Sequence, residues 1–477
     1  MRRAYDVAQV RAAEAAMMAR LPEGVLMQRA AAGLARVCLD VLGGGYGREV
    51  AVLVGSGDNG GDALFAGARL AGRGARVTAI QVSDRIHRDG LAALRRAGGR
   101  VVSADDLAAE RAVGGADVVI DGMLGIGGRG ALTGAAARFA QLALAAGGVR
   151  VAADLPSGVD ADTGVVAGAA FAADVTVAFG CLKPGLLTRP GRDLAGVVEV
   201  IDIGLAETLP SAAPVLVLDH ASAALRLPRP GPDSDKYARG VVGLVAGSRA
   251  YPGAGVLAAE AAVHAGAGLV RALGSAAEAV VAARPEVVPA EGRVQAWVVG
   301  PGMEPDADTA TAVRWALDDD VPVVLDAGAL AVVAGDEGLR AAIRERAATT
   351  VLTPHDGEYA RLAGVAPADR LGAARWLADD LGAVVLLKGF ATIVAEPGGP
   401  SWVNPTGTPW LATAGSGDVL AGLLGALLAA GAPDAPALAA YLHGLAGRLA
   451  AGGAPASALA VARALPAAAR SLTGAVG

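Results

Sequence analysis

Short apolar runs that end in glycine-rich or polar turns recur along the first part of the chain. The stretch "REVAVLVGSGDNGGDALFAGARLAGRGARVTAIQV", residues 48–82, predicts a strand, a glycine-rich turn, a helix and a second strand. Three later runs end in "DGMLGIG", "DLPSGVD" and "GCLKPG". Strands that alternate with helices are typical of a parallel sheet covered by helices. We therefore expect an α/β fold whose ligands bind beyond the carboxyl ends of the strands.

The alternation lapses and then resumes, which predicts a second domain. Residues 219–240, "DHASAALRLPRPGPDSDKYARG", contain closely spaced prolines and read as a connection. Apolar runs return in "GVVGLVAGS", "VPVVLDAGAL" and "GAVVLLKGF". A chain of 477 residues is also too long for one ordinary core. We expect α/β domains at 1–215 and 236–477, with a linker at 216–235.

The composition suits packed helix-on-sheet layers rather than a membrane protein. Hydrophobic residues make up 53% of the chain, aromatic residues 3%, and glycine occurs 68 times, so the apolar mass is mostly Ala, Val and Leu. The longest apolar run, residues 419–433, falls short of the ~20 residues that a membrane span needs. The N-terminus lacks the apolar core of a signal peptide. We predict neither a membrane span nor export.

The cysteines and the net charge indicate where the protein is located and which classes of binding partner it has. Cys38 and Cys181 lie far apart, and we expect both to be reduced core thiols of a cytoplasmic protein. The histidines are scattered without ligand spacing, which argues against a zinc site. The net charge of −6 comes without a basic cluster, which argues against nucleic acid or a membrane as the partner.

The string GSGD occurs twice, at 55–58 and 415–418, each time before a helix-like run. At such a turn, backbone N–H groups and the helix dipole favour anions. The first copy also matches the dinucleotide fingerprint G-x-G-x-x-G, with Asp84 as a candidate ribose ligand. Carboxylates at Asp58 and Asp62 would, however, repel a pyrophosphate. The alternative is a loop that binds a cation or a polar group, and the different positions of the two copies disfavour a duplication.

Oxygen-bearing side chains at the predicted strand ends favour that alternative, because such oxygens suit hard cations. Together, "GSGDNGGDA", "IDGMLGIGGRG", "DLPSGVD" and "AFGCLKPG" resemble, in order and spacing, the N-terminal epimerase domain of the bifunctional NAD(P)H-hydrate repair enzymes. The resemblance covers residues 1 to about 210. It implies a Rossmann-like three-layer sandwich that interconverts the R and S epimers of NADHX and NADPHX, the hydrated forms of NADH and NADPH.

The resemblance also implies a set of site residues. A potassium site is expected at Asn59, Asp121 and Ser157. Contacts with NADHX or NADPHX are expected from Asp58, Asn59, Gly60, Gly61, Asp62, Gly125, Ile126, Gly127, Gly128, Arg129, Gly130, Ala131 and Asp154. Chemistry supports Asp154 as the acid/base residue, because epimerising a carbinolamine carbon requires reversible loss of its hydroxyl or opening of its ring. Lys183 is a candidate for stabilising developing negative charge.

Some of these residues have a plain structural alternative. Asp62 is equally well explained as a helix cap, and Asp160 and Asp162 as turn residues. The family commonly carries Asn at the position of Asp58 and Gly at that of Ala63. We expect potassium binding to survive these departures, and the charge of Asp58 to weaken contacts with substrate phosphates.

The second GSGD predicts a different chemistry. Glycines before an aspartate at a helix start form an anion hole, in which Gly415 to Gly417 hold a phosphoryl group while Asp418 takes a proton from the attacked hydroxyl. This arrangement resembles the ribokinase superfamily. With "GPGM", "TPHDGE" and "ATAGSGDVLAG", residues 230 to about 470 resemble its ADP-dependent (S)-NAD(P)H-hydrate dehydratase. A ribokinase-like three-layer sandwich that uses ADP with Mg²⁺ is implied.

For this second domain, the resemblance implies substrate contacts at Ala254, Gly302, His355 and Asp418. Nucleotide contacts are implied at Lys388, Gly389, Phe390, Ala391, Thr392 and Gly417. Phosphorylation would turn the hydroxyl into a leaving group, so that elimination restores the ring double bond. Thr408 and Trp410 replace an Asn and a Gly that the family usually carries.

Three other functions stay open at this point: an NAD-dependent oxidoreductase, a small-molecule kinase of the ribokinase type, and a non-catalytic binding module in either half. A kinase would leave a stable phosphorylated product, and a binding module would tolerate Asp154→Asn or Asp418→Asn. The sequence does not separate ADP from ATP or NADHX from NADPHX as substrates. We expect a homo-oligomer.

Overall fold

The structure is a computed structural model that describes residues 1–474, and it divides the chain into two compact units. The N-terminal unit comprises Arg3–Pro214, and the C-terminal unit begins at Val215 and includes Met1–Arg2. The segment 216–235, expected as a linker, holds the end of β9 (Val215–Val217) and all of α8 (His220–Ala224). Both elements belong to the C-terminal unit.

The N-terminal unit is built on a seven-stranded parallel sheet in the order β4-β3-β2-β5-β6-β7-β8. Its strands are β2 (Glu49–Val54), β3 (Arg76–Gln81), β4 (Arg100–Ser103), β5 (Val118–Gly122), β6 (Val149–Ala153), β7 (Val175–Phe179) and β8 (Val197–Ile201). From β2 the chain winds first toward β4 and then, from β5, toward β8. The carboxyl ends of β2 and β5 therefore form the switch point where open α/β sheets bind ligands.

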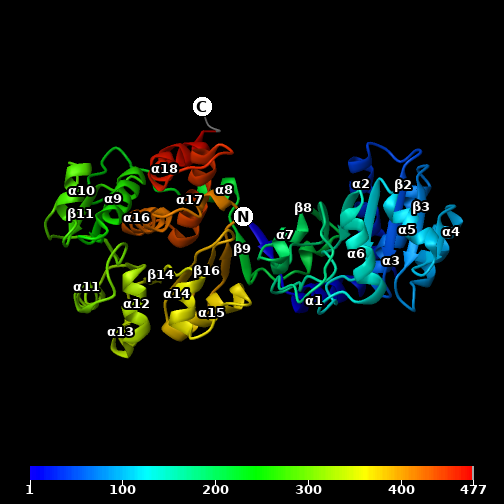
Figure 1. Ribbon diagram of the computed structural model, residues 1–477, viewed down its shortest axis with the longest axis horizontal. Helices are drawn as coiled ribbons and strands as arrows, with labels where there is room; N and C mark the ends of the chain where they lie inside the picture. Colours follow the sequence, from blue (N-terminus) through cyan, green and yellow to red (C-terminus); the bar gives the residue numbers. More distant parts are fainter. Residues whose placement is uncertain (475–477) are drawn as a thin grey trace. The chain divides into compact units, whose positions relative to one another are not determined.

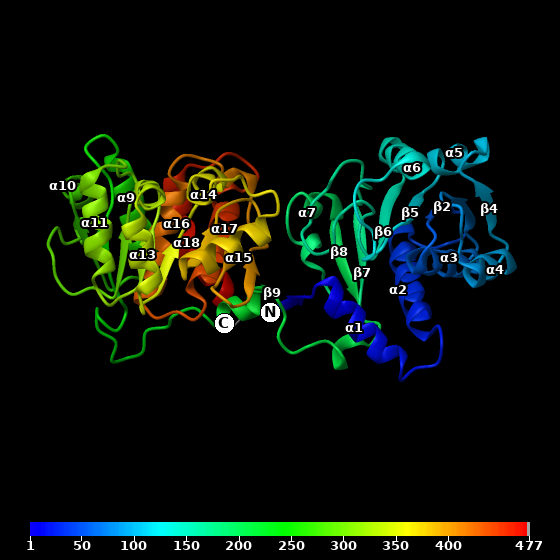
Figure 2. The same ribbon diagram turned by 90° about the horizontal axis from the view of Figure 1, so that it is seen from below.

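Helices cover both faces of this sheet, as Figure 2 shows. One face packs against α2 (Val25–Leu42), α3 (Asp58–Ala71) and α4 (Arg88–Arg96), and the other against α5 (Leu107–Gly114) and α6 (Gly134–Ala145). Alternate residues of β2 serve the two cores, since Val52 points to the first face and Leu53 to the second. Double coverage explains why the strands are continuous apolar runs. The first helix, α1 (Val7–Met18), and α7 (Gly191–Ala195) complete the unit.

The C-terminal unit is built on a ten-stranded sheet in the order β1-β9-β17-β16-β15-β14-β13-β12-β10-β11. These strands are β1 (Arg2–Ala4), of which only Arg2 is counted in this unit, β10 (Val241–Val245), β11 (Leu269–Leu273), β12 (Ala296–Val299), β13 (Val323–Leu325), β14 (Thr350–Leu352), β15 (Val384–Leu387), β16 (Ile393–Ala395) and β17 (Ser401–Val403), with β9. The run from β11 to β15 is parallel, and β16 pairs antiparallel with both neighbours.

Two helical layers enclose this sheet, as Figure 1 shows. One layer holds α9 (Pro252–His264), α10 (Ala277–Ala283), α16 (Ser416–Ala429), α17 (Ala435–Ala451) and α18 (Ala458–Thr473). The other holds α11 (Ala307–Leu317), α12 (Gly328–Gly335), α13 (Glu337–Glu345), α14 (Asp356–Ala363) and α15 (Arg370–Leu381). Both units are thus three-layer α/β sandwiches, as the sequence predicts.

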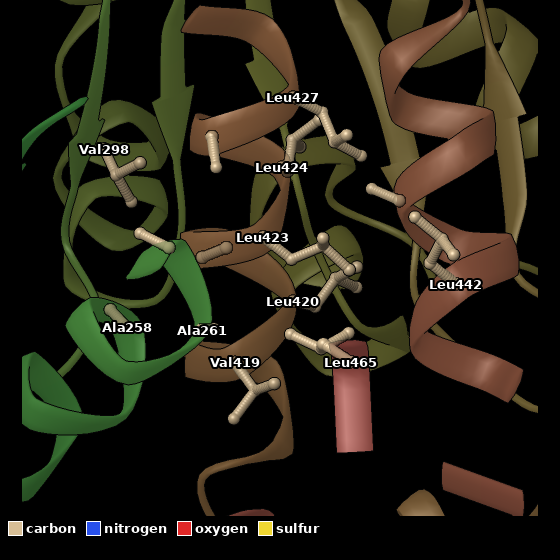
Figure 3. Packing of buried hydrophobic residues seen from close by; sticks show 14 of the residues in the cluster. Ala258, Ala261, Val298, Val419, Leu420, Leu423, Leu424, Leu427, Leu442 and Leu465 are labelled. Atoms are coloured by element: carbon tan, nitrogen blue, oxygen red, sulfur yellow. The ribbon is translucent and has the colours of Figure 1, made fainter. Parts of the chain in front are cut away.

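The longest apolar run of the sequence forms the centre of this core. Figure 3 shows α16 directing leucines toward α17 and α18 while α9 lies against its other side. A Cβ at Gly422 would overlap the carbonyl of Ala258, so this glycine permits the close approach of α16 and α9. Within residues 1–474, no helix combines the length and apolar character that crossing a membrane takes.

Two candidate active sites

Gly55 of the first GSGD string and Gly60, which follows the string, pack two loops together at the switch point. A Cβ at Gly55 would overlap the carbonyl of Met123, and one at Gly60 the carbonyl of Gly55. The loops after β2 and β5 are therefore in direct contact, and the first turn of α3 follows at once. Gly55 and Gly60 therefore have a packing reason that does not involve a bound pyrophosphate, in line with the alternative to the dinucleotide fingerprint, whereas a Cβ at Gly57 would meet no neighbour.

The three residues of the expected potassium site converge on the backbone of Leu124. Asn59 Nδ2 donates to the Leu124 carbonyl at 3.0 Å, and Ser157 Oγ accepts from Leu124 N at 2.9 Å. Ser157 donates to both oxygens of Asp121, from Oγ at 2.7 Å and from its backbone N at 2.8 Å. Residues more than 90 positions apart in sequence thus form one oxygen-rich, hydrogen-bonded cluster at the ends of β2, β5 and β6.

Asp121 is a carboxyl group with no exposed surface. Burial raises its pKa to about 6, although the hydrogen bonds from Ser157 and Met123 oppose that shift. No lysine or arginine of the described chain pairs with it. Its oxygens, the Asn59 amide, the Ser157 hydroxyl and the Leu124 carbonyl form a donor set that suits a hard cation such as potassium.

A buried ion pair lies at the end of β6. Lys183 Nζ is 2.5 Å from Asp154 Oδ1 and also donates to the carbonyl of Phe179 at 2.9 Å, while Phe179 N donates to the same Asp154 oxygen at 3.1 Å. The Lys183 side chain is 1% exposed. Asp154 has φ +68°, an unusual conformation for a residue other than glycine and one that clusters at functional sites.

Two further carboxyls face this pair. Burial, and then the charge of Asp154, raise the pKa of Glu14 on α1 above its usual value. Burial raises the pKa of Asp62 on α3 well above its usual value, and Asp154, Asp58 and Glu14 add to the effect. Sequence reasoning missed Glu14, because it lies in the middle of a helix and not at a strand end. Only tertiary contacts bring α1 here: Val7 N donates to Asp162 Oδ1 at 2.7 Å.

The structure separates the turn and helix-cap interpretations of Asp160, Asp162 and Asp62. Asp160 is a turn residue, because its Oδ1 accepts from the backbone of Asp162 and Thr163. Asp162 instead anchors the start of α1. The helix-cap interpretation of Asp62 is wrong: the N-cap of α3 is Gly57 and receives no side-chain hydrogen bond, and Asp62 Oδ1 has no partner in the described chain.

The remaining expected contacts of this unit surround the same place. Gly125 packs against Asn59, since a Cβ there would lie 3.2 Å from the Asn59 Cβ. Arg11 of α1 approaches Gly127, so the segment 125–131 lies between α1 and the first turn of α3. Of the two departures from the family pattern, Asp58 is exposed and Ala63 is fully buried against Gly122.

In the C-terminal unit the second GSGD string opens α16, and charged side chains converge on it. A Cβ at Gly417 would lie 3.6 Å from Lys388 Nζ and 3.9 Å from Asp326 Oδ2. The neighbouring Asp418 is half-buried. Burial and the charge of Asp326 raise the pKa of Asp418 to about 6, against the opposing effect of Lys388. A carboxyl group therefore stands beside a helix N-terminus and a lysine.

Lys388 contacts two carboxylates. Its Nζ lies 2.6 Å from Asp326 Oδ1 and 3.4 Å from Glu358 Oε2, and Thr353 Oγ1 donates to the same Asp326 oxygen at 2.9 Å. Sequence reasoning missed Asp326 and Glu358. A signal existed for Asp326, because it ends the apolar run "VPVVL" just as Asp121 and Asp154 end theirs.

The other expected contacts of this unit lie on neighbouring loops. His355 caps α14, where its Nδ1 accepts from the backbone of Gly357 and Glu358 at 3.0 and 3.1 Å, and its side chain is 57% exposed. Gly302, with φ +65°, packs against Ala254. In the turn from Lys388 to Thr392, the Thr392 hydroxyl donates to the Gly389 carbonyl at 2.9 Å.

The two family departures near the anion hole differ in exposure. Thr408 is buried, at 8%, and Trp410 is 41% exposed in the short 3₁₀ turn Pro409–Leu411.

Both cysteines are buried and free, as predicted, and burial raises the pKa of Cys38 to about 12.

Comparisons with known proteins agree with this division. Residues 23–185 match the family "YjeF-related protein N-terminus", and residues 242–465 match "NAD(P)H-hydrate dehydratase". The chain is 51% identical over 449 residues to the bifunctional NAD(P)H-hydrate repair enzyme Nnr of Mycobacterium leprae (strain TN), which covers 92% of this chain and 91% of that protein. The enzyme of the same name from Mycobacterium tuberculosis (strain ATCC 25618 / H37Rv) is 49% identical over 453 residues, with 92% of each chain covered.

A solved structure shares the fold of the C-terminal unit. It is a ribokinase-like superfamily protein from Enterococcus faecalis V583, with a TM-score of 0.50 and 24% identity, and the match covers 54% of this chain and 96% of that chain. The ribokinase-like architecture expected from the second GSGD string is thereby confirmed.

Proposed function

This chain belongs to the bifunctional NAD(P)H-hydrate repair enzymes, and we propose that its two sites divide the repair between them. The N-terminal site epimerises (R)- and (S)-NADHX and NADPHX, and the C-terminal site dehydrates the S epimer with ADP as the phosphate donor. The observation that carries this proposal is the 51% identity that extends across both units. A dehydratase that accepts one epimer needs an epimerase beside it, because hydration yields both.

In the N-terminal site, the Asp154–Lys183 pair supports proton transfer at the carbinolamine carbon. Both donors to Asp154 use Oδ1, which leaves Oδ2 to exchange a proton with the substrate. Lys183 is enclosed by protein, so we assign it to holding Asp154 in place rather than to binding the substrate.

A potassium ion fits the donor set of Asn59, Asp121 and Ser157. The supporting observation is the fully buried carboxyl of Asp121, which no cationic side chain of residues 1–474 neutralises. A bound potassium ion would supply that charge. The Asn59 and Ser157 side chains themselves join the segments after β2 and β6 to Leu124 in the loop after β5.

In the C-terminal site, Asp418 is the base that takes the proton of the substrate hydroxyl as it attacks the terminal phosphate of ADP, which binds with Mg²⁺. The N–H groups at the start of α16 stabilise the transferring phosphoryl group. Lys388 adds a positive charge beside Gly417. AMP leaves, and loss of the phosphate together with a proton from the adjacent ring carbon then restores the ring double bond.

The test mixes the purified protein with both epimers of NADHX or NADPHX, magnesium and either ADP or ATP, and follows the return of reduced-nicotinamide absorbance. We expect full recovery from both epimers, and a faster reaction with ADP. The Asp154→Asn variant should recover reduced nicotinamide only from the S epimer. The Asp418→Asn variant should recover none but should still interconvert the two epimers. Failure of the unmodified protein with both nucleotides contradicts the proposal, and a stable phosphorylated product identifies a small-molecule kinase instead.

We also propose a cytoplasmic location, which the two free buried thiols support, and a homo-oligomeric state. Fractionation and light scattering test these two points independently of the chemistry.

A further inference from the structure

One carboxyl group at the N-terminal site is enclosed without a partner. Asp62, in the second turn of α3, is 8% exposed, and its Oδ1 is buried and makes no hydrogen bond within the described chain. The charges that bear on it are all negative: Asp154, Asp58 and Glu14.

Physical chemistry dictates the form of such a group. Burying an ionised carboxylate without a cation or a hydrogen-bond donor is costly, which favours the neutral acid and raises the pKa. Burial and the three neighbouring carboxyls act in the same direction on its pKa. A neutral carboxyl is a hydrogen-bond donor, and Asp62 has no acceptor in the described chain for that proton.

Epimerisation by loss and return of the hydroxyl needs such a donor. On one face of the ring, a proton must reach the carbinol oxygen so that the C–O bond breaks, the ring nitrogen forms a C=N bond and water leaves. On the other face, a water must attack the same carbon, returning the electron pair to nitrogen and giving its proton to a carboxylate. Two carboxyl groups in different protonation states perform this exchange, and unlike environments keep them so.

We propose that Asp62 is the proton donor of the epimerisation and that Asp154 is the proton acceptor on the opposite face of the ring. This assignment rests on the proposed epimerase function and adds the second catalytic residue to it. Asp154 is tied to Lys183 and Phe179 N, whereas Asp62 has neither a cation nor a donor. Return of the proton from Asp154 to Asp62 through solvent, or the reverse reaction, resets the pair.

The groups that face Asp62 come from several elements. Asp58 lies one helical turn earlier on α3, Glu14 comes from α1, and Asp154 follows β6. His87, at the start of α4, lies against the neighbouring Gly61, and its Nδ1 accepts from Gly90 N at 3.1 Å. None of these four groups is a lysine or an arginine.

The test uses the full chain with Asp62→Asn, which keeps the shape of the side chain and removes the proton. The assay starts from (R)-NADHX with MgADP, so that epimerisation must precede recovery of NADH. We expect epimerisation to slow by about 100-fold or more, the usual value of a general acid. Dehydration of (S)-NADHX by the same preparation stays at the wild-type rate and reports that the protein is folded. Asp105→Asn, at an exposed carboxyl of the same unit, is the matched control.

The pH profile separates this role from a structural one. Because the donor must be protonated, wild-type epimerisation falls as pH rises through the pKa of Asp62. We expect Asp62→Asn to lose that alkaline limb and Asp62→Glu to restore it. If Asp62→Asn epimerises at the wild-type rate, or keeps an unchanged alkaline limb, the assignment is overturned. Epimerisation would then proceed by ring opening with Asp154 as its one catalytic carboxyl group. Absence of epimerisation in the unmodified protein overturns the proposed function instead.

Discussion

Each unit buries one aspartate–lysine pair at the end of a strand, and the two pairs differ in what surrounds them. Lys183 Nζ lies 2.5 Å from Asp154, and Lys388 Nζ lies 2.6 Å from Asp326. At both strand ends the backbone takes a positive φ at a residue other than glycine, at Asp154 and at Ala327. The second contact of Lys183 is a backbone carbonyl, whereas that of Lys388 is the carboxylate of Glu358.

The surroundings explain how one arrangement serves two chemistries. Lys183 is enclosed, at 1% exposure, and the carboxyls of Glu14 and Asp62 stand near its partner Asp154, which suits the proton exchange that we propose for this site. The Lys388 side chain is 17% exposed and stands beside the N-terminus of α16, which suits the phosphoryl transfer that we propose there. An aspartate–lysine pair at a strand end is therefore not diagnostic of a reaction; the exposure of the lysine and the elements that surround the pair distinguish the two sites.

The two pairs should differ most in the unfolding free energy that is lost when the aspartate of each pair is replaced, and Asp154→Asn should lose more. Asp154→Asn leaves Lys183 charged, buried and without a carboxylate, and breaking a buried pair in this way costs about 3–5 kcal/mol of unfolding free energy. Urea unfolding of the N-terminal unit measures this loss, and epimerisation should be abolished. The double variant Asp154→Asn/Lys183→Met should recover stability without recovering activity. Equal stability of Asp154→Asn and wild type would contradict the buried-pair interpretation.

Asp418→Asn should affect only the other site. Without its base, dehydration of (S)-NADHX should slow by about 10²–10⁴-fold, while the R and S epimers still interconvert. Chromatography of the epimers together with NADH absorbance measures both reactions in one sample. If epimerisation also stops, the two sites are not independent and the comparison between them fails.

Asp326→Asn should destabilise the protein less than Asp154→Asn does, because Lys388 keeps Glu358 as its partner. We expect the free energy of unfolding to fall by about 1–2 kcal/mol. With Asp418 as the proposed base, dehydration needs its ionised form, so we expect the rate to fall as pH drops below about 6. Removing Asp326 takes away a negative charge that raises this pKa, so the acid limb of the pH–rate profile should move to lower pH. A limb that moves upward or stays in place would contradict this account of the charges.

How far the sequence predicts these sites depends on whether the signal is local. Asp121, Asp154 and Asp418 could be found because apolar runs and glycine turns mark strand ends and helix starts within a few residues. Asp326 carries the same signal and could have been found. Glu14 carries none, since its place at the site depends on the docking of α1.

Sheet order belongs to the same class of tertiary information. The predicted strands correspond closely to the observed ones, but that β2 lies between β3 and β5 follows from long-range pairing. Similarly, the lack of any partner for Asp62 is a property of its packed surroundings and not of its sequence neighbours.

The smallest predicted effect compares the two GSGD strings directly, since the same substitution is made at their aspartates. Asp58 is exposed at the start of α3, and its charge adds to the rise in the pKa of Asp62. Asp58→Asn should therefore lower the pKa of Asp62 only slightly, because solvent screens an exposed charge. The alkaline limb of epimerisation should move to lower pH by that amount, with the plateau rate nearly kept. A loss comparable to that of Asp418→Asn would mean that the two strings do the same chemistry after all.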